Sequence, residues 1–147
     1  MKITYKGDYA VKAMLDLALH YEANSVVTIH YLAGHADIPI KFLEQVLLDL
    51  KRGGFVESRR GKVGGYLLAK HPSQIKLGEV IKFIDGPLEP IACVEKNYSG
   101  CADIYKCIFR KIWQKVGRAT SDIVDNISFE DLANQIKSQK EKIVYQI

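Results

Sequence analysis

Apolar residues recur every three or four positions through most of the first fifty residues, which is the spacing of one face of a helix. The pattern predicts a first helix over about residues 5–22 and a short second helix over residues 29–36, with Thr28 as its N-cap. A third helix is predicted to start near Pro39 and to end at Gly53. Two helices joined by a tight turn, the second of them amphipathic, are typical of a helix-turn-helix motif.

The predicted third helix has two different faces. Its inward stripe is predicted to consist of apolar residues, namely Phe42, Leu43, Val46, Leu47 and Leu50. The opposite face is predicted to lie in a DNA major groove, where glutamine can pair with adenine, glutamate can accept from cytosine, and lysine serves guanine or phosphate. The DNA-binding residues predicted at this helix are Pro39, Lys41, Glu44 and Gln45.

A stretch with strand character follows the third helix. Residues 55–57 and 66–68 are predicted to form two strands, joined by a glycine-rich basic tip over residues 60–65. This β-wing lies in a run, from Lys51 to Lys70, with six basic residues and one acid. Basic side chains suit phosphate, and glycines let a backbone come close to it. The wing residues predicted to bind DNA are Arg59, Arg60, Lys62, Gly64 and Gly65. A solvated basic face, or a winged helix used only for protein contacts, is the alternative.

The pattern changes twice after the wing. Residues 75–84 predict another short amphipathic helix, ended by Gly86 and Pro87. Residues 88–100 have neither a helical nor a strand period and are predicted to form a loop. Apolar residues then recur every three or four positions over residues 104–127, which predicts one long helix.

The length of that helix bears on the oligomeric state. It would extend about 35 Å at about 1.5 Å per residue. So small a domain cannot cover the whole apolar stripe of this helix, near which Trp113 lies. We therefore expect a homodimer, whose two-fold symmetry suits double-stranded DNA with a palindromic operator. Ser128 with Asp131 predicts the capping box of a last helix through about residue 140, followed by a frayed tail.

Composition indicates an ordinary folded protein, since the 147 residues are 48% hydrophobic and 26% charged. No apolar run approaches the roughly 20 residues of a membrane span, and no signal-peptide core is present, so we expect a soluble, cytoplasmic protein without a membrane partner. The predicted fold class is mainly α with a small β-wing. It comprises a winged helix-turn-helix DNA-binding domain over residues 1–86, a cysteine-bearing loop over residues 87–103, and a dimerisation helix with a C-terminal helix over residues 104–147.

Three cysteines, Cys93, Cys101 and Cys107, fall within fifteen residues of one another. An odd number cannot pair fully within one chain, and disulfides are rare in a reducing compartment, so metal binding or redox sensing is favoured over a disulfide framework. Thiolates suit iron-sulfur clusters, whereas gaps of seven and five residues between the cysteines are unlike the close pairs of zinc ribbons. These residues alone favour ordinary thiols over any metal. The four histidines are scattered, and each is expected to be a surface or core residue.

Several separate motifs, in the same order along the chain, resemble those of the Rrf2 family of bacterial transcription regulators. Residues 4–11, TYKGDYAV, resemble the opening motif of the family. Residues 42–45, FLEQ, are similar to its motif of tyrosine or phenylalanine followed by LEQ, and residues 60–68, RGKVGGYLL, resemble its wing. The resemblance covers nearly the whole chain and implies a DNA-binding repressor.

The resemblance also implies a role for the cysteines. Many family members hold an iron-sulfur cluster on three cysteines in the loop before the dimerisation helix, so Cys93, Cys101 and Cys107 are expected to ligate a 2Fe-2S or 4Fe-4S cluster. Members that regulate iron-sulfur cluster biogenesis have a histidine three residues after the third cysteine, where this chain has Arg110. Nitric-oxide-sensing members donate an acidic residue of the first helix across the dimer, which implies Asp8 as the fourth ligand. The helix dipole explains a carboxylate at that place equally well.

The function implied by the resemblance is repression by a cluster-bound dimer. Repression would be relieved or altered when the cluster reacts with nitric oxide or oxygen, or when iron is short. The alternative is a cluster-free regulator of the same family, controlled by a metabolic protein partner or by thiol oxidation. An enzyme is not expected, because the chain has no nucleotide-binding loop and no catalytic dyad.

Overall fold

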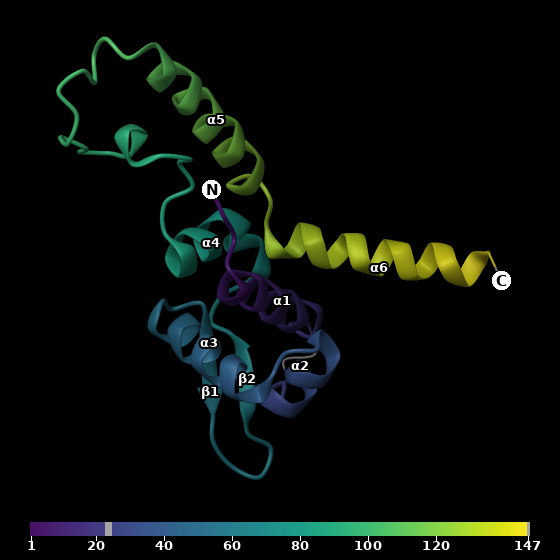
Figure 1. The fold of residues 1–147 in the computed structure, drawn as a ribbon. Coiled ribbons are helices and arrows are strands. Elements are labelled where there is room, and N and C mark those ends of the chain that lie inside the picture. The colour runs from purple at the N-terminus through teal and green to yellow at the C-terminus, as the bar shows by residue number, and fades with distance from the viewer. Residues whose placement is uncertain (23–24, 147) are drawn as a thin grey trace.

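The computed structural model describes residues 1–22 and 25–146 (Figure 1), so residue 147 of the predicted dimerisation segment lies outside it. The described chain is mostly helical with a small two-stranded antiparallel sheet, which confirms the predicted fold class. The elements in chain order are α1 (Tyr5–Leu19), α2 (Ile29–Ala36), α3 (Ile40–Arg52), β1 (Val56–Arg59), β2 (Gly65–Leu68), the 3-10 turn η1 (Pro72–Gln74), α4 (Leu77–Asp85), the 3-10 turn η2 (Ala92–Val94), α5 (Ile108–Val124) and α6 (Phe129–Tyr145).

Helix α1 lies at the centre of the fold and packs against α3, α4 and α6. Its buried side includes Ala10, Met14 and Leu17, as the helical spacing predicts. Full burial of an apolar side chain such as leucine or methionine contributes about 1.5–3 kcal/mol. The core also receives residues from the other elements, among them Leu43, Leu47, Leu50, Val80, Phe129 and Ala133. The core therefore includes α6, which lies beyond the cysteines in the chain.

Helices α2 and α3 form the predicted helix-turn-helix. Thr28 caps α2, because its hydroxyl oxygen accepts a hydrogen bond of 3.2 Å from the Tyr31 amide. At the end of α2 the backbone of Asp37 adopts the left-handed conformation, with φ of 53°. The Ile38 amide then donates to the Ala33 carbonyl at 2.9 Å, which closes the tight turn before α3.

The wing is joined to the start of α2. Strands β1 and β2 pair in register from Val56 with Leu68 to Arg59 with Gly65. Val27, just before α2, forms an isolated bridge with Tyr66 through two backbone hydrogen bonds of 2.8 Å. A side chain at Gly65 would place its Cβ 2.5 Å from the Val27 carbonyl oxygen, so only glycine permits this close approach. The wing and the helix-turn-helix are thereby held as one unit.

The second half differs from its prediction in where the helices begin and end. Helix α5 starts at Ile108 rather than at residue 104, because residues 103–107 form a separate turn in which the amides of Lys106 and Cys107 donate to the Asp103 carbonyl. Apolar residues in an isolated turn can recur at the same spacing as in a helix, so the sequence pattern does not distinguish this turn from the start of α5. Helix α5 ends at Val124, and α6 continues to Tyr145 instead of fraying after residue 140.

Helix α5 projects from the rest of the fold (Figure 1), and its only buried residue is Gly117. We call residues 88–107 the cysteine segment, the cysteine segment with α5 the arm, and the remaining described elements the body. Large apolar side chains are exposed along α5, namely those of Ile108, Phe109, Ile112, Trp113, Val116 and Ile123. Across residues 1–22 and 25–146, no helix combines the length and apolar character needed to cross a membrane.

Candidate DNA-binding surface and cysteine segment

The exposed face of α3 carries the polar residues that the sequence predicts. Lys41, Glu44 and Gln45 are exposed, whereas Leu43 and Leu47 are fully buried on the other side. Pro39 is exposed at the N-cap of α3 and makes no side-chain capping hydrogen bond there. The three polar side chains are therefore accessible on this face of α3.

Asp49 organises the base of this surface. The Lys6 ammonium lies 2.5 Å from the Asp49 carboxylate and holds the pKa of that carboxyl below its usual value. The Gln45 side-chain amide donates to the other carboxylate oxygen at 3.3 Å, and Arg52 lies 3.4 Å from the same oxygen. Gln45 thus has one amide hydrogen bond within α3, while its carbonyl oxygen makes none within the described residues.

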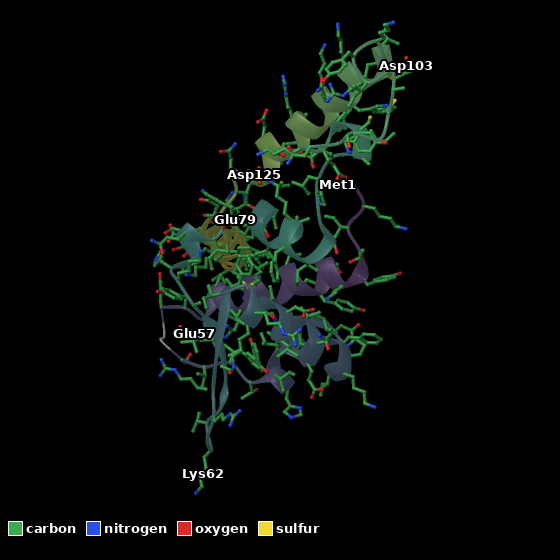
Figure 2. The ribbon with its side chains drawn as sticks, turned by 90° about the vertical axis from the view of Figure 1, so that its left-hand side faces the viewer. Met1, Glu57, Lys62, Glu79, Asp103 and Asp125 are labelled. Atoms are coloured by element: carbon green, nitrogen blue, oxygen red, sulfur yellow. The ribbon has the colours of Figure 1, made fainter. Side chains whose placement is uncertain are left out.

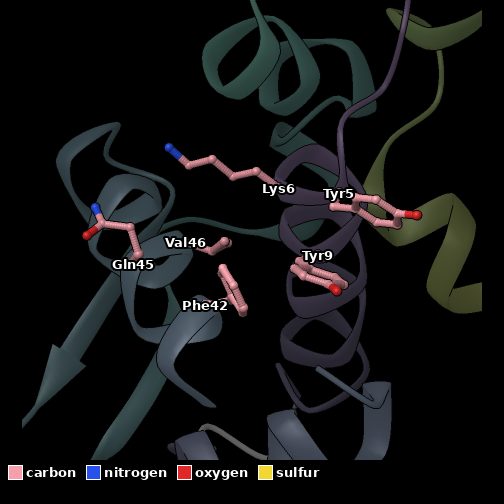
Figure 3. A pocket seen from close by; sticks show the side chains of 6 residues that line it. All are labelled: Tyr5, Lys6, Tyr9, Phe42, Gln45 and Val46. Atoms are coloured by element: carbon pink, nitrogen blue, oxygen red, sulfur yellow. The ribbon is translucent and has the colours of Figure 1, made fainter. Parts of the chain in front are cut away.

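A hollow of about 380 Å³ lies between α1 and α3 (Figure 3). Tyr5, Lys6 and Tyr9 line it from α1, and Phe42, Gln45 and Val46 line it from α3. The prediction that Phe42 faces inward is wrong, because 64% of this residue is exposed. Position 42 lies at the edge of the apolar stripe, and helical spacing alone does not determine on which side of the edge a residue lies.

A second hollow, of about 490 Å³, lies between the start of α2 and the wing. Its lining includes the predicted DNA-binding residues Arg59, Arg60, Lys62, Gly64 and Gly65. Seven further residues line it without having been predicted to bind DNA, among them Thr28, His30, Lys51 and Ser58. Lys51 donates to the Ser58 hydroxyl at 2.6 Å and so joins α3 to the wing. Lys51 is the first residue of the basic run from Lys51 to Lys70, so that run could have indicated its place on this basic surface.

The glycines of the wing are required by the wing itself. A Cβ at Gly64 would lie 2.8 Å from the Arg59 carbonyl oxygen, and Gly65 lies against Val27. Gly61 has a φ of +127°, which side chains rarely allow. Close approach of DNA to Gly64 and Gly65 stays a prediction, because internal packing already accounts for the absence of side chains there.

The cysteine segment holds all three cysteines as free thiols. Cys93 is half-buried in η2, Cys101 is exposed, and Cys107 is half-buried at the N-cap of α5. In the described part of the chain, no three histidine, cysteine, aspartate or glutamate side chains are grouped so that they could hold one metal ion. The donor chemistry nevertheless fits an iron-sulfur cluster, because three solvent-accessible thiols lie on one short segment.

Asp8 lies in the first turn of α1 and is paired with a cation. The Lys12 ammonium donates to its carboxylate at 2.6 Å, and this hydrogen bond raises the pKa of the Lys12 amine. Within the described residues of one chain, Asp8 does not form a three-residue ligand group with the cysteines. Its predicted role as a ligand from the partner subunit therefore stays a prediction.

Helix α4 connects α1 to the arm. At one end of α4, the Thr4 amide donates to the Asp85 carboxylate at 3.0 Å, and that carboxylate lies so close to Gly7 that no Cβ would fit there. On the other side, Lys82 pairs with Asp125 at 2.7 Å, just after α5. The wing tip at Lys62 and the cysteine segment at Asp103 lie at opposite ends of the molecule (Figure 2). Helices α1 and α4 lie between them.

The sequence matches a known family over most of its length. Residues 3–135 match the family described as Rrf2, iron-dependent transcriptional regulator. Over 134 residues the chain is 37% identical to the HTH-type transcriptional regulator IscR of Escherichia coli, and the match covers 91% of this chain and 81% of that protein.

Solved structures of similar fold agree with this match. The structure of CymR, the global cysteine regulator of B. subtilis, is similar with a TM-score of 0.77 at 28% identity, over 92% of this chain and 98% of that one. The structure of IscR from T. potens is similar with a TM-score of 0.72 at 29% identity, over 92% of this chain and 88% of that one.

Proposed function

Because the chain belongs to the Rrf2 family of transcriptional regulators, we propose that it represses transcription as a homodimer whose operator binding depends on an iron-sulfur cluster. The observation that carries this proposal is the position of Cys93, Cys101 and Cys107, three free thiols on the one segment that joins α4 to α5. The description of the family as iron-dependent supports such a cofactor.

Operator binding uses α3 and the wing. The exposed side chains of Lys41, Glu44 and Gln45 offer donors and acceptors to base edges in the major groove. Arg59, Arg60 and Lys62 bind phosphates beside the groove, and Lys51 extends this basic surface to α3. Phosphate contacts supply affinity and position α3, and the contacts of α3 with the bases supply specificity. Gly64 and Gly65 line the hollow of the wing and Pro39 is the N-cap of α3, and at these positions the backbone would approach the DNA.

Dimerisation uses the exposed apolar stripe of α5. An exposed apolar stripe on a projecting helix costs free energy in water, and packing against the same stripe of a second copy removes that cost. Ile112 and Val116 lie one helical turn apart on this stripe and are both exposed. A two-fold pair of chains presents two α3 helices, which suits a palindromic operator.

The three cysteines would hold the cluster, and Asp8 of the partner subunit would be the candidate for the fourth place. When bound, the cluster supplies a reactive iron centre that responds to nitric oxide, oxygen or iron shortage. For this role Asp8 would give up its ion pair with Lys12, and its carboxylate would then join α1 to the partner's cysteine segment. A structural change at the cysteines would thereby be transmitted to α1, which packs directly against α3.

A second path runs within one chain through α4. The cysteine segment begins just after α4, whose end is held to α1 by the hydrogen bonds of Asp85 with Thr4. The other end of the arm is held to α4 by Lys82 and Asp125. A movement of the arm therefore changes the packing of α4 on α1 and the tilt of the two α3 helices in the dimer.

Two observations favour a cluster-free regulator as the second candidate. Within the described residues the thiols are not grouped around a single ion, and the chain is also similar to a protein described as a global cysteine regulator. In that case the cysteines act by oxidation, or the arm binds a metabolic protein. The two candidates share the same DNA-binding surface and differ in the cofactor.

The deciding experiment is anaerobic purification with iron and sulfide assays, absorbance spectra and a promoter gel shift. We expect coloured protein with several irons per dimer, and a change in DNA binding after exposure to nitric oxide or removal of iron. A Cys93/Cys101/Cys107→Ala variant should be colourless and should not respond. Colourless wild-type protein, or full and unresponsive DNA binding by both proteins, would exclude the cluster and favour the second candidate.

A further inference from the structure

Arg110, in the first turn of α5, joins two parts of the cysteine segment. Its Nε donates a partly buried hydrogen bond of 3.1 Å to the backbone carbonyl oxygen of Cys93, seventeen residues earlier in the chain. Cys107, three residues before Arg110, is the N-cap of α5. One side chain therefore ties the 3-10 turn that carries the first cysteine to the helix end that carries the third.

This tie is specific to one place in the segment. Turn η2 is otherwise closed by its own hydrogen bonds, from Val94 to Ile91 and from Glu95 to Ala92. Among the side-chain hydrogen bonds of the described residues, the one from Arg110 is the link between the cysteine segment and α5. The exposed Cys101 has no comparable link there. The structure thus fixes Cys93 relative to Cys107 and leaves Cys101 on the outer part of the segment.

Helix stability does not explain a cation at position 110. The N-terminal end of a helix carries partial positive charge and favours acidic side chains. Helix α5 has no acidic residue in its first turn and no side-chain cap, yet it carries Arg110 and Lys111 there. The hydrogen bond to Cys93 gives Arg110 a function that the helix itself does not.

We infer that Arg110 is a positioning residue that sets the separation of Cys93 and Cys107 and so prepares two of the ligands for an iron-sulfur cluster. The inference rests on the proposed function, since it concerns the same cofactor. It assigns Arg110 a role through the backbone of Cys93, not as a ligand. The donor is Nε, and the guanidinium charge is not required for the contact.

Matched substitutions separate the hydrogen bond from the charge. In Arg110→Gln the side-chain amide nitrogen occupies the same number of bonds from Cα as Nε in arginine, so the donor is kept and the charge is lost. Arg110→Met has a similar length and neither donor nor charge. Lys111→Met removes an exposed charge from the same helical turn and is the control.

The readouts are the visible circular dichroism spectrum of the anaerobically reconstituted cluster and the rate at which a chelator removes its iron. We expect Arg110→Met to change the spectrum and to release iron about tenfold faster, the effect of losing one partly buried hydrogen bond. Arg110→Gln and Lys111→Met should stay within about twofold of wild type. The inference would be overturned if Arg110→Gln had the spectrum and iron-release rate of Arg110→Met, or if Arg110→Met had those of wild type.

A measurement without the cofactor distinguishes this inference from the proposed function. If wild-type protein holds no cluster, the proposed function fails, and the role of Arg110 in preparing cluster ligands fails with it. Hydrogen exchange of the Val94 and Glu95 amides in cluster-free protein then tests the tie alone. Faster exchange in Arg110→Met than in Arg110→Gln supports the tie, and equal exchange in both variants rejects it.

Discussion

Helices α5 and α6 are both 17 residues long, but they are stabilised differently. Helix α6 begins with a capping box, in which the Ser128 amide donates to the Asp131 carboxylate at 2.8 Å, and it buries Phe129 completely in the body. Helix α5 has no side-chain cap and buries only Gly117. The N-terminal end of α6 is therefore anchored in the core of its own chain, while α5 has an exposed apolar stripe and an uncapped N-terminal end.

The largest effect is expected on the free energy of unfolding, when a phenylalanine of α6 and one of α5 are each replaced by alanine. Phe129→Ala should lower the free energy of unfolding by about 3–5 kcal/mol, because it leaves a cavity in the core. Phe109→Ala removes the same atoms from an exposed position on α5, where 61% of the residue is accessible. Urea unfolding at several protein concentrations tests the difference. The cost of Phe109→Ala should appear only at concentrations at which the chain is dimeric, and a cost independent of concentration would show that the arm is stabilised by its own chain.

The next effect concerns the dimer. Ile112→Asp with Val116→Asp should raise the dimer dissociation constant at least about a hundredfold, since each buried apolar side chain contributes about 1.5–3 kcal/mol. Sedimentation measures the association, and far-ultraviolet circular dichroism should report a folded body. Arg118→Asp, at an exposed position on another side of α5, is the control. An unchanged dimer in the double variant would remove α5 as the interface.

The third effect lies in the body and should leave the arm unchanged. Arg59→Ala with Arg60→Ala should weaken DNA binding about tenfold or more and reduce the salt slope of the binding constant by about 2, as expected for two phosphate contacts. Fluorescence anisotropy over a range of salt concentrations measures both quantities. Lys96→Ala removes an exposed cation from the cysteine segment and should change neither. Equal effects of the two variants would mean that net charge, not the wing, determines DNA binding.

The smallest effect tests the link between body and arm. Lys82→Met breaks a half-exposed ion pair with Asp125 and should change the free energy of unfolding by less than about 1 kcal/mol. It should nevertheless reduce, several-fold, the difference in DNA affinity between cluster-loaded and cluster-free protein. Lys137→Met, which breaks the exposed pair with Glu22, is the matched control. Gel shifts of cluster-loaded and cluster-free protein measure this difference in DNA affinity for both variants. If the difference equals that of wild type in both, the path through Lys82 and Asp125 is ruled out.

Features that depend on neighbouring residues were predictable from the sequence. The N-cap Thr28, the capping box of Ser128 and Asp131, the exposed face of α3 and the two wing strands follow from local patterns, and the structure has each of them. Local hydrogen bonds and helical spacing determine these features, so neighbouring residues in the sequence are enough to predict them.

Features that depend on contacts between distant segments were not predictable. The exposure of Phe42 and the closeness of Gly7 to Asp85 are set by tertiary packing. The hydrogen bond from Arg110 to Cys93 joins residues seventeen positions apart, and no periodic pattern indicates it. The cysteines could be found by type and spacing, but their positions relative to one another could not be derived from either.

The backbone pairing of Lys76 with Ser128 has a consequence for how such proteins can diversify. The Leu77 amide donates to the Ile127 carbonyl and the Phe129 amide to the Ile75 carbonyl, so the stretch made of α4 and the arm begins and ends at one place. The arm is the outer part of this insertion, beyond α4. A sensing segment of different length or chemistry could replace it while the DNA-binding body keeps its fold, whereas deletion of everything after the wing would remove Phe129 from the core.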